Sequence, residues 1–138
     1  MASARGIPDR VLVDTSAWIE FFRTPVSRVG DLVAELLRET RACSLGLIAV
    51  ELYRGAKGAG ERESLDELFK TIESLRESED THRTAGLLCN RLARKGITVG
   101  TVDAMIATVA LEHGCALLSL DRHFKELAPH CQLKLFEV

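Results

Sequence analysis

The chain has 138 residues, of which 46% are hydrophobic and 28% charged, and its formal net charge is −2. This length is typical of one domain and is enough to bury a core without disulfides or structural metals. A slightly acidic chain excludes a protein that holds nucleic acid through bulk positive charge. Any RNA binding would depend on local basic groups or on metal ions.

The cysteines and the apolar segments indicate the compartment. The four cysteines are widely spaced among apolar neighbours, without a Cys-x-x-Cys pair: Cys43, Cys89, Cys115 and Cys131. This pattern is typical of free, buried thiols in a reducing compartment. Because the chain has no membrane-length apolar run and no signal-peptide core, we expect a soluble cytoplasmic protein with no membrane contact.

Strands and helices alternate along the predicted chain. The run Val11-Leu12-Val13 is typical of a parallel strand covered on both faces, and Thr15 or Ser16 is the predicted cap of the helix that follows. In chain order we predict a strand at 10–14, helices at 15–22 and 27–40, a strand at 42–45, helices at 47–57 and 61–73, a weak strand at 74–78, helices at 80–95 and 103–113, and strands at 116–120 and 133–136.

This alternation predicts a single α/β domain with a parallel sheet over residues 1–138, with no internal boundary. About residues 1–9 are expected to be a loosely ordered N-terminus. In the helix at 80–95, Leu87, Leu88 and Leu92 are expected to face the core.

Two aspartates directly follow predicted strands. Asp14 comes after Val11-Leu12-Val13, and Asp121 comes after Leu117-Leu118-Ser119-Leu120. Ligands bind at the carboxyl edge of open α/β sheets, so the two side chains could converge there. The alternative for each is a simple helix cap.

Two further acids lie on helices that are apolar almost all round. Glu51 lies within Leu47–Tyr53, which is expected to be buried, and Asp103 opens the helix that begins Asp-Ala-Met-Ile-Ala. A buried carboxylate is costly unless it is paired or near a metal. An ion pair with Arg54 is the alternative for Glu51, and helix capping is the alternative for Asp103.

Together, the four acids indicate a metal site. Like charges held close together must bind protons or recruit cations, and oxygen ligands select hard divalent ions such as Mg²⁺ or Mn²⁺. Such an ion activates water and binds the oxygens of a phosphodiester. It would also reverse the local charge that otherwise repels RNA.

These residues, in this order, resemble the PIN-domain ribonucleases, most closely the VapC toxins of bacterial toxin–antitoxin pairs. The resemblance covers nearly the whole chain and rests on four short motifs: Val13-Asp14-Thr15-Ser16-Ala17, Val50-Glu51-Leu52-Tyr53-Arg54-Gly55, Asp103-Ala104-Met105-Ile106-Ala107 and Leu118-Ser119-Leu120-Asp121-Arg122-His123-Phe124. Two positions depart from the pattern. Ile48 stands where many relatives have Thr or Ser, and His123 stands where many have another acid.

The resemblance implies a three-layer α/β/α fold with a parallel sheet of four or five strands, usually assembled as a homodimer. It implies a Mg²⁺- or Mn²⁺-dependent endoribonuclease that leaves a 5′-phosphate and a 3′-hydroxyl. It also implies a cognate small antitoxin whose tail occupies a groove of the toxin, with DNA bound only through that antitoxin.

The resemblance also assigns roles to the residues of the site. Asp14 and Asp103 would bind the metal directly, and Glu51 and Asp121 would act through water or complete the site. Ser119 is a candidate partner for one of these carboxylates, and Arg54 and Arg122 are candidate phosphate contacts. His123 weakens the case for a second metal, so one ion is the expected number.

Two alternatives from other classes stay open. An inactive PIN-like module that binds RNA or protein would be expected to lack one of the four acids, and none is missing. A phosphoryl-transfer domain with a strand-end nucleophile would need an acidic pair or Asp-x-Asp, which Asp14-Thr15-Ser16 does not supply. The sequence leaves open which RNA is cut and whether the dimer is obligate.

Overall fold

A computed structural model describes residues 9–138. The central sheet has four parallel strands in the order β3-β2-β1-β4. Their bounds are β1 Val11–Val13, β2 Ala42–Leu45, β3 Glu73–Leu75 and β4 Ala116–Leu118. The predicted α/β class and parallel sheet are therefore confirmed. The predicted N-terminus at about residues 1–9 falls, apart from Asp9, outside the described residues.

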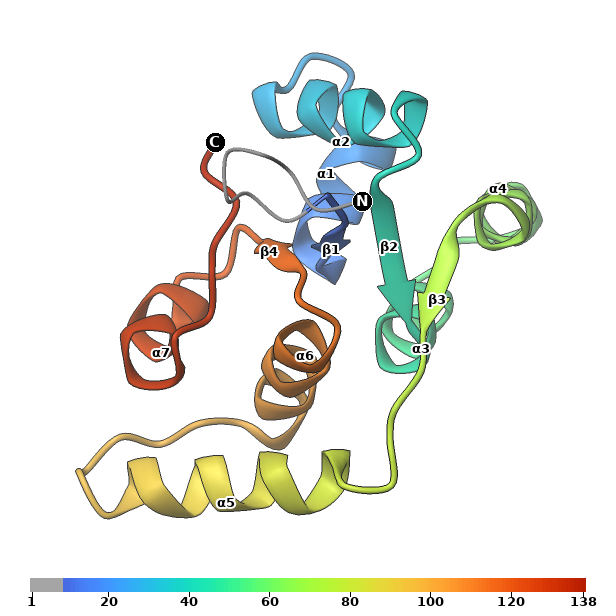
Figure 1. The fold of residues 1–138 in the computed structure, drawn as a ribbon. Coiled ribbons are helices and arrows are strands. Elements are labelled where there is room, and N and C mark those ends of the chain that lie inside the picture. The colour runs from blue at the N-terminus through green and yellow to red at the C-terminus, as the bar shows by residue number, and fades with distance from the viewer. Residues whose placement is uncertain (1–8) are drawn as a thin grey trace.

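Seven helices surround the sheet in the part of the chain that the structure describes. They are α1 Thr15–Arg23, α2 Arg28–Arg38, α3 Gly46–Arg54, α4 Ala59–Thr71, α5 Thr81–Ala93, α6 Thr101–Glu112 and α7 His123–Cys131. Figure 1 shows α1 and α2 grouped on one side of the sheet and α5 and α6 grouped on the other. Among these residues, no helix combines the length and the apolar character needed to cross a membrane.

The core is built on three of the four strands, β1, β2 and β4, whose residues are all buried. Every residue of β1, β2 and β4 is buried, as continuous apolar runs between two helical layers require. Helix α6 is the most deeply embedded helix, because all its residues from Ala104 to Ala110 are buried. The small alanines let neighbouring elements approach closely. The four cysteines are free thiols, as predicted, but only Cys43 and Cys115 are buried, whereas Cys89 and Cys131 are partly exposed.

Two predictions about the sheet and helices near the C-terminus were wrong. The strand predicted at 133–136 is a single parallel bridge between Leu117 and Leu135, because only the backbone of Lys134 and Phe136 hydrogen-bonds to β4. Helix α7 was not predicted, and it contains Pro129 in its last turn, where the helix is about to end anyway.

The predicted inward stripe of α5 was also partly wrong. Leu88 and Leu92 are buried, but Leu87 is 50% exposed. Adjacent residues on a helix point about 100° apart, and α5 buries only one face, so Leu88 lies on that face and Leu87 does not.

Candidate active site

Asp14 is a nearly buried carboxylate at the carboxyl end of β1, with only 6% of its surface exposed. It occupies the N-cap position of α1, but its side chain makes no cap hydrogen bond, so the capping alternative is wrong for this residue. Its Oδ2 instead accepts hydrogen bonds from Ser119 Oγ at 2.7 Å and Ser16 Oγ at 3.1 Å. The prediction that Thr15 or Ser16 caps the helix is likewise wrong, since both lie inside it.

The two serines tie the loop after β4 to the loop after β1. Ser119 Oγ, which donates to Asp14, also accepts the backbone N–H of Asp121 at 3.0 Å. Ser16 Oγ accepts the backbone N–H of Leu120 at 2.9 Å. Each hydroxyl uses its single proton on the carboxylate and its lone pairs on the backbone. Asp14 and Asp121 are thus positioned relative to each other through Ser119.

Glu51 reaches the site from the second turn of α3. Its Oε1 accepts a hydrogen bond from Thr15 Oγ1 at 2.8 Å, which joins it to the start of α1. No ion pair links it to Arg54 within residues 9–138, so the structure does not support that alternative. The prediction that this helix is buried was wrong, because Val50 is 62% exposed and only Ile48 and Leu52 are buried.

Asp103 is the third residue of α6, and Gly100 occupies the N-cap position, so the capping alternative is wrong here too. Burial is the main cause that raises the pKa of Asp103 above its usual value. The negative charges of Asp121, Asp14 and Glu51 raise this pKa further, and His123 opposes them. Asp103 therefore lies within the electrostatic reach of all three other acids.

Asp121 follows β4 and leads into α7. Its Oδ1 accepts the backbone N–H of His123 at 2.9 Å, so this carboxylate does contribute to the start of the helix. The ring of His123 turns back toward the acids, with Nδ1 3.2 Å from Asp121 Oδ1 and 3.9 Å from Asp103 Oδ2. Ligand atoms of Asp103, Asp121 and His123 all lie within 4.8 Å of one another.

The donor set fits a divalent cation. The two described hydrogen bonds of the Asp14 carboxylate both go to Oδ2, which leaves the lone pairs of Oδ1 for another ligand. A carboxylate buried this deeply is unfavourable without a compensating charge, and three more acids surround the same place. Oxygen-rich sites of this kind suit hard divalent ions.

Several residues of the site were missed or underrated by sequence reasoning. Thr15 and Ser16 were interpreted only as helix caps, whereas they position Glu51 and Asp14. His123 was interpreted only as the loss of an acid, whereas its ring contacts two of the carboxylates. Ile48, the other residue that departs from the family motifs, is fully buried in the core.

The candidate phosphate contacts lie beside the site without fixed partners. Arg54 is exposed at the end of α3, and Arg122 is exposed at the N-cap position of α7. In the described part of the chain neither side chain makes a hydrogen bond or an ion pair. Both are thus available to an incoming ligand.

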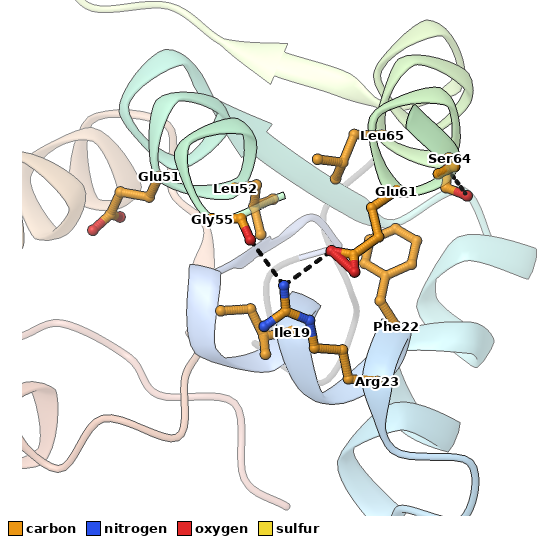
Figure 2. Close-up of a pocket in the computed structure, with 10 residues that line it drawn as sticks. Ile19, Phe22, Arg23, Glu51, Leu52, Gly55, Glu61, Ser64 and Leu65 are labelled. Carbon is orange, nitrogen blue, oxygen red and sulfur yellow. Dashed lines mark hydrogen bonds and ion pairs between the residues drawn. The ribbon is translucent and has the colours of Figure 1, made fainter. Parts of the chain in front are cut away.

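A mostly apolar cavity lies between α1, α3 and α4, and of the four acids Glu51 alone lines it. Its volume is about 190 Å³, and Figure 2 shows Glu51 at its edge with the carboxylate pointing away from Arg23. Arg23 Nη2 donates to the Gly55 carbonyl and to Glu61 Oε1, both at 3.0 Å. The apolar wall consists of Ile19, Phe22, Leu52 and Leu65.

Comparison with known families agrees with this geometry. The family model described as PIN domain matches residues 11–129, which span all four strands and the four acids. The chain therefore belongs to the PIN-domain family.

Within that family, its curated relatives include VapC ribonucleases. A VapC ribonuclease of Mycobacterium bovis is 34% identical over 124 residues, which cover 86% of this chain and 91% of the relative. Ribonuclease VapC11 of Mycobacterium tuberculosis matches with the same identity and coverage.

Solved structures share the fold. A DNA-bound VapBC from Salmonella typhimurium has a TM-score of 0.76 at 20% identity, covering 92% of this chain and 96% of that chain. VapBC-5 from Mycobacterium tuberculosis, described as a member of a toxin–antitoxin family, has a TM-score of 0.70 at 23% identity, covering 95% and 100%. At these identities the likeness concerns the fold.

The raised pKa of Asp103 gives a stability prediction. A carboxyl group whose pKa is raised on folding favours the native state at low pH, and this contribution is lost as the pH rises through the raised pKa. We therefore expect Asp103→Asn to raise the melting temperature of the protein in EDTA at neutral pH, by a few degrees at most. The gain should shrink toward acid pH, as followed by circular dichroism.

Glu63→Gln is the matched control, because it removes the same charge from an exposed position of α4. It should leave the melting temperature nearly unchanged across the same pH range. Equal responses of the two variants would contradict the burial and repulsion that raise the pKa of Asp103.

Proposed function

We propose that this chain is a Mg²⁺- or Mn²⁺-dependent endoribonuclease and the toxin component of a toxin–antitoxin pair, acting as a single PIN domain. The observation that carries the proposal is the convergence of Asp14, Glu51, Asp103 and Asp121. The four acids come from different segments of the chain, and the charges of the other three all raise the pKa of Asp103, which supports their lying near one another. The kinship with VapC ribonucleases supplies the substrate class.

Asp14 and Asp103 are proposed as direct ligands of the ion, with Glu51 and Asp121 acting through water. The ion, when bound, supplies positive charge for the phosphodiester and activates a water molecule for attack on phosphorus. Asp14 offers its free Oδ1, because Ser16 and Ser119 hold Oδ2. Cleavage would leave a 5′-phosphate and a 3′-hydroxyl.

Other residues of the chain would orient the substrate. Without a cation the four carboxylates repel a phosphate group, so RNA binding depends on the loaded site. Arg54 and Arg122 are proposed phosphate contacts, because both are exposed on segments that also carry an acid of the site. Their guanidinium groups can bind phosphate oxygens in a bidentate manner.

The central test replaces a proposed ligand. Asp14→Asn and Asp103→Asn are each expected to lower the rate of RNA cleavage by about a hundredfold or more, because each change removes a charged ligand of the ion. Excess EDTA should abolish cleavage by the unaltered protein, measured with labelled RNA in Mg²⁺ or Mn²⁺.

Glu63→Gln is again the control, and it should cleave at the unaltered rate. Circular dichroism would establish that each variant is folded. Undiminished cleavage by both aspartate variants, or full activity in EDTA, would contradict the proposal and favour an inactive module or a metal-independent mechanism.

A second test concerns the positioning of Asp14. Ser119→Ala removes a 2.7 Å hydrogen bond to Oδ2 and the acceptor of the Asp121 N–H. Loss of such supporting hydrogen bonds typically weakens metal binding by about 10- to 100-fold. Calorimetric titration with Mn²⁺ should detect this loss, while Ser64→Ala, at an exposed position of α4, should bind like the unaltered protein.

We further infer that a cognate small antitoxin occupies the apolar cavity of Figure 2. The cavity adjoins Glu51, so a bound chain segment would also cover the approach to the acids. Ile19 and Phe22 are each 39% exposed there, which favours an apolar contact. The VapBC complexes of the same fold support a partner of this kind, and any contact with DNA would pass through it.

The chain is also proposed to form a homodimer. Leu87 on α5 and Leu111 on α6 are 50% and 40% exposed, and they line one surface hollow. Large apolar side chains gathered on one face favour burial against another chain.

The antitoxin proposal predicts that a charge added inside the cavity weakens antitoxin binding, whereas a charge added outside it does not. Phe22→Glu should weaken binding of the small protein encoded beside this gene by at least about tenfold, because it places a charge in an apolar interface. Val26→Glu should not, because Val26 is 90% exposed and lies outside the cavity. Biolayer interferometry would measure both, and equal affinities would contradict this location.

A further inference from the structure

We propose that His123 is a ligand of the catalytic ion and gives this site a preference for a transition metal such as Mn²⁺ over Mg²⁺. The inference rests on the proposed function, because it concerns the same ion. It differs in two respects: it adds a nitrogen ligand to a site that the sequence alone would describe by its oxygens, and it makes Asp121 a direct ligand beside Asp103 in place of a water-mediated one.

The distances suit a shared ion. In octahedral coordination with bonds of about 2.1 Å, neighbouring ligand atoms lie about 3.0 Å apart and opposite ones about 4.2 Å apart. His123 Nδ1 is 3.2 Å from Asp121 Oδ1 and 3.9 Å from Asp103 Oδ2. One ligand atom from each of the three residues lies within 4.8 Å of the other two. An ion placed among them needs only small side-chain adjustments.

The backbone holds the imidazole in this place. His123 is the first residue of α7, and its N–H donates to Asp121 Oδ1 at 2.9 Å, which fixes the start of the helix beside that carboxylate. Asp103 is fixed on the other side by α6, the helix most embedded in the core. The described polar contacts of the His123 ring are to these two acids. The ring therefore lies on the wall of the acidic site.

The chemistry of the ring determines the preference. Carboxylate and water ligands suit Mg²⁺, whereas imidazole suits first-row transition ions, which bind nitrogen more tightly. The other donors are carboxylates, so the site keeps the hard character that Mn²⁺ also accepts. A set of carboxylates with one imidazole thus favours Mn²⁺ over Mg²⁺ relative to carboxylates alone.

A competing account makes His123 an internal cation. A protonated imidazole beside Asp103 and Asp121 would neutralise part of their charge, and a metal would then have to displace it. The two accounts differ in the effect of removing the ring. As a ligand, its loss weakens Mn²⁺ binding; as an internal cation, its loss strengthens it.

The experiment combines affinity with a spectroscopic readout. Calorimetric titrations with Mn²⁺ and with Mg²⁺ would compare the unaltered protein with His123→Ala and His123→Asp. Pulsed electron paramagnetic resonance of the Mn²⁺-loaded protein would detect the ¹⁴N coupling of a directly bound imidazole. His82→Ala, at an exposed position of α5, is the matched control.

We expect a ¹⁴N signal in the unaltered protein and in His82→Ala, and its loss in both His123 variants. His123→Ala should weaken Mn²⁺ binding by about tenfold or more, and His123→Asp should lower the ratio of Mn²⁺ to Mg²⁺ affinity by a similar factor. Absence of the nitrogen signal, or tighter Mn²⁺ binding by His123→Ala, would overturn the inference.

Failure of the inference about His123 can be told apart from failure of the proposed nuclease function. If the protein binds Mn²⁺ and cleaves RNA only with metal, but shows no nitrogen coupling, the nuclease proposal stands and the role of His123 fails. If no metal binds and cleavage persists in EDTA, both fail.

Discussion

Electrostatic repulsion at the carboxyl edge of the sheet is the constraint on which the site depends. Parallel strands end at one edge, so the acid that follows β1 and the acid that follows β4 are brought together by strand order alone. Helices α3 and α6 add Glu51 and Asp103 to the same place. The hydroxyls of Ser16 and Ser119 hold Asp14, and the hydroxyl of Thr15 holds Glu51. The fold thus maintains a concentration of negative charge that protonation of a carboxylate or a bound cation would relieve.

The fold could be predicted from the sequence where one physical effect dominates. The continuous apolar runs of β1 and β4 and the small residues of α6 admit only buried positions. The prediction failed where two effects compete. Helix α3 has an apolar sequence yet leaves Val50 exposed at the surface, because burial depends on which elements pack against it. Helix α7 contains a proline, and the edge bridge of Leu135 is too short for a strand pattern.

The site, too, could be predicted where one physical effect dominates and not where two effects compete. The four acids could be chosen from their positions after strands and on apolar helices, and the structure brings them together. Sequence reasoning had no means of choosing between capping and ligand roles, since both use an Asp at the start of a helix. The hydrogen bonds of Ser16 and Thr15 were also out of reach. That of Thr15 depends on how α1 and α3 approach each other, and those of Ser16 depend on how the loop after β4 approaches the start of α1.

Helix α6 limits which amino-acid substitutions the protein can accept during evolution. Every position from Ala104 to Ala110 is enclosed, so nearly any enlargement there would displace a neighbour, and the helix that carries Asp103 has little room for drift. Helix α4 and the outer faces of α3 and α7 meet solvent and tolerate substitution far better. Divergence would therefore accumulate on these exposed surfaces, which include the proposed partner contacts, while the position of Asp103 stays fixed.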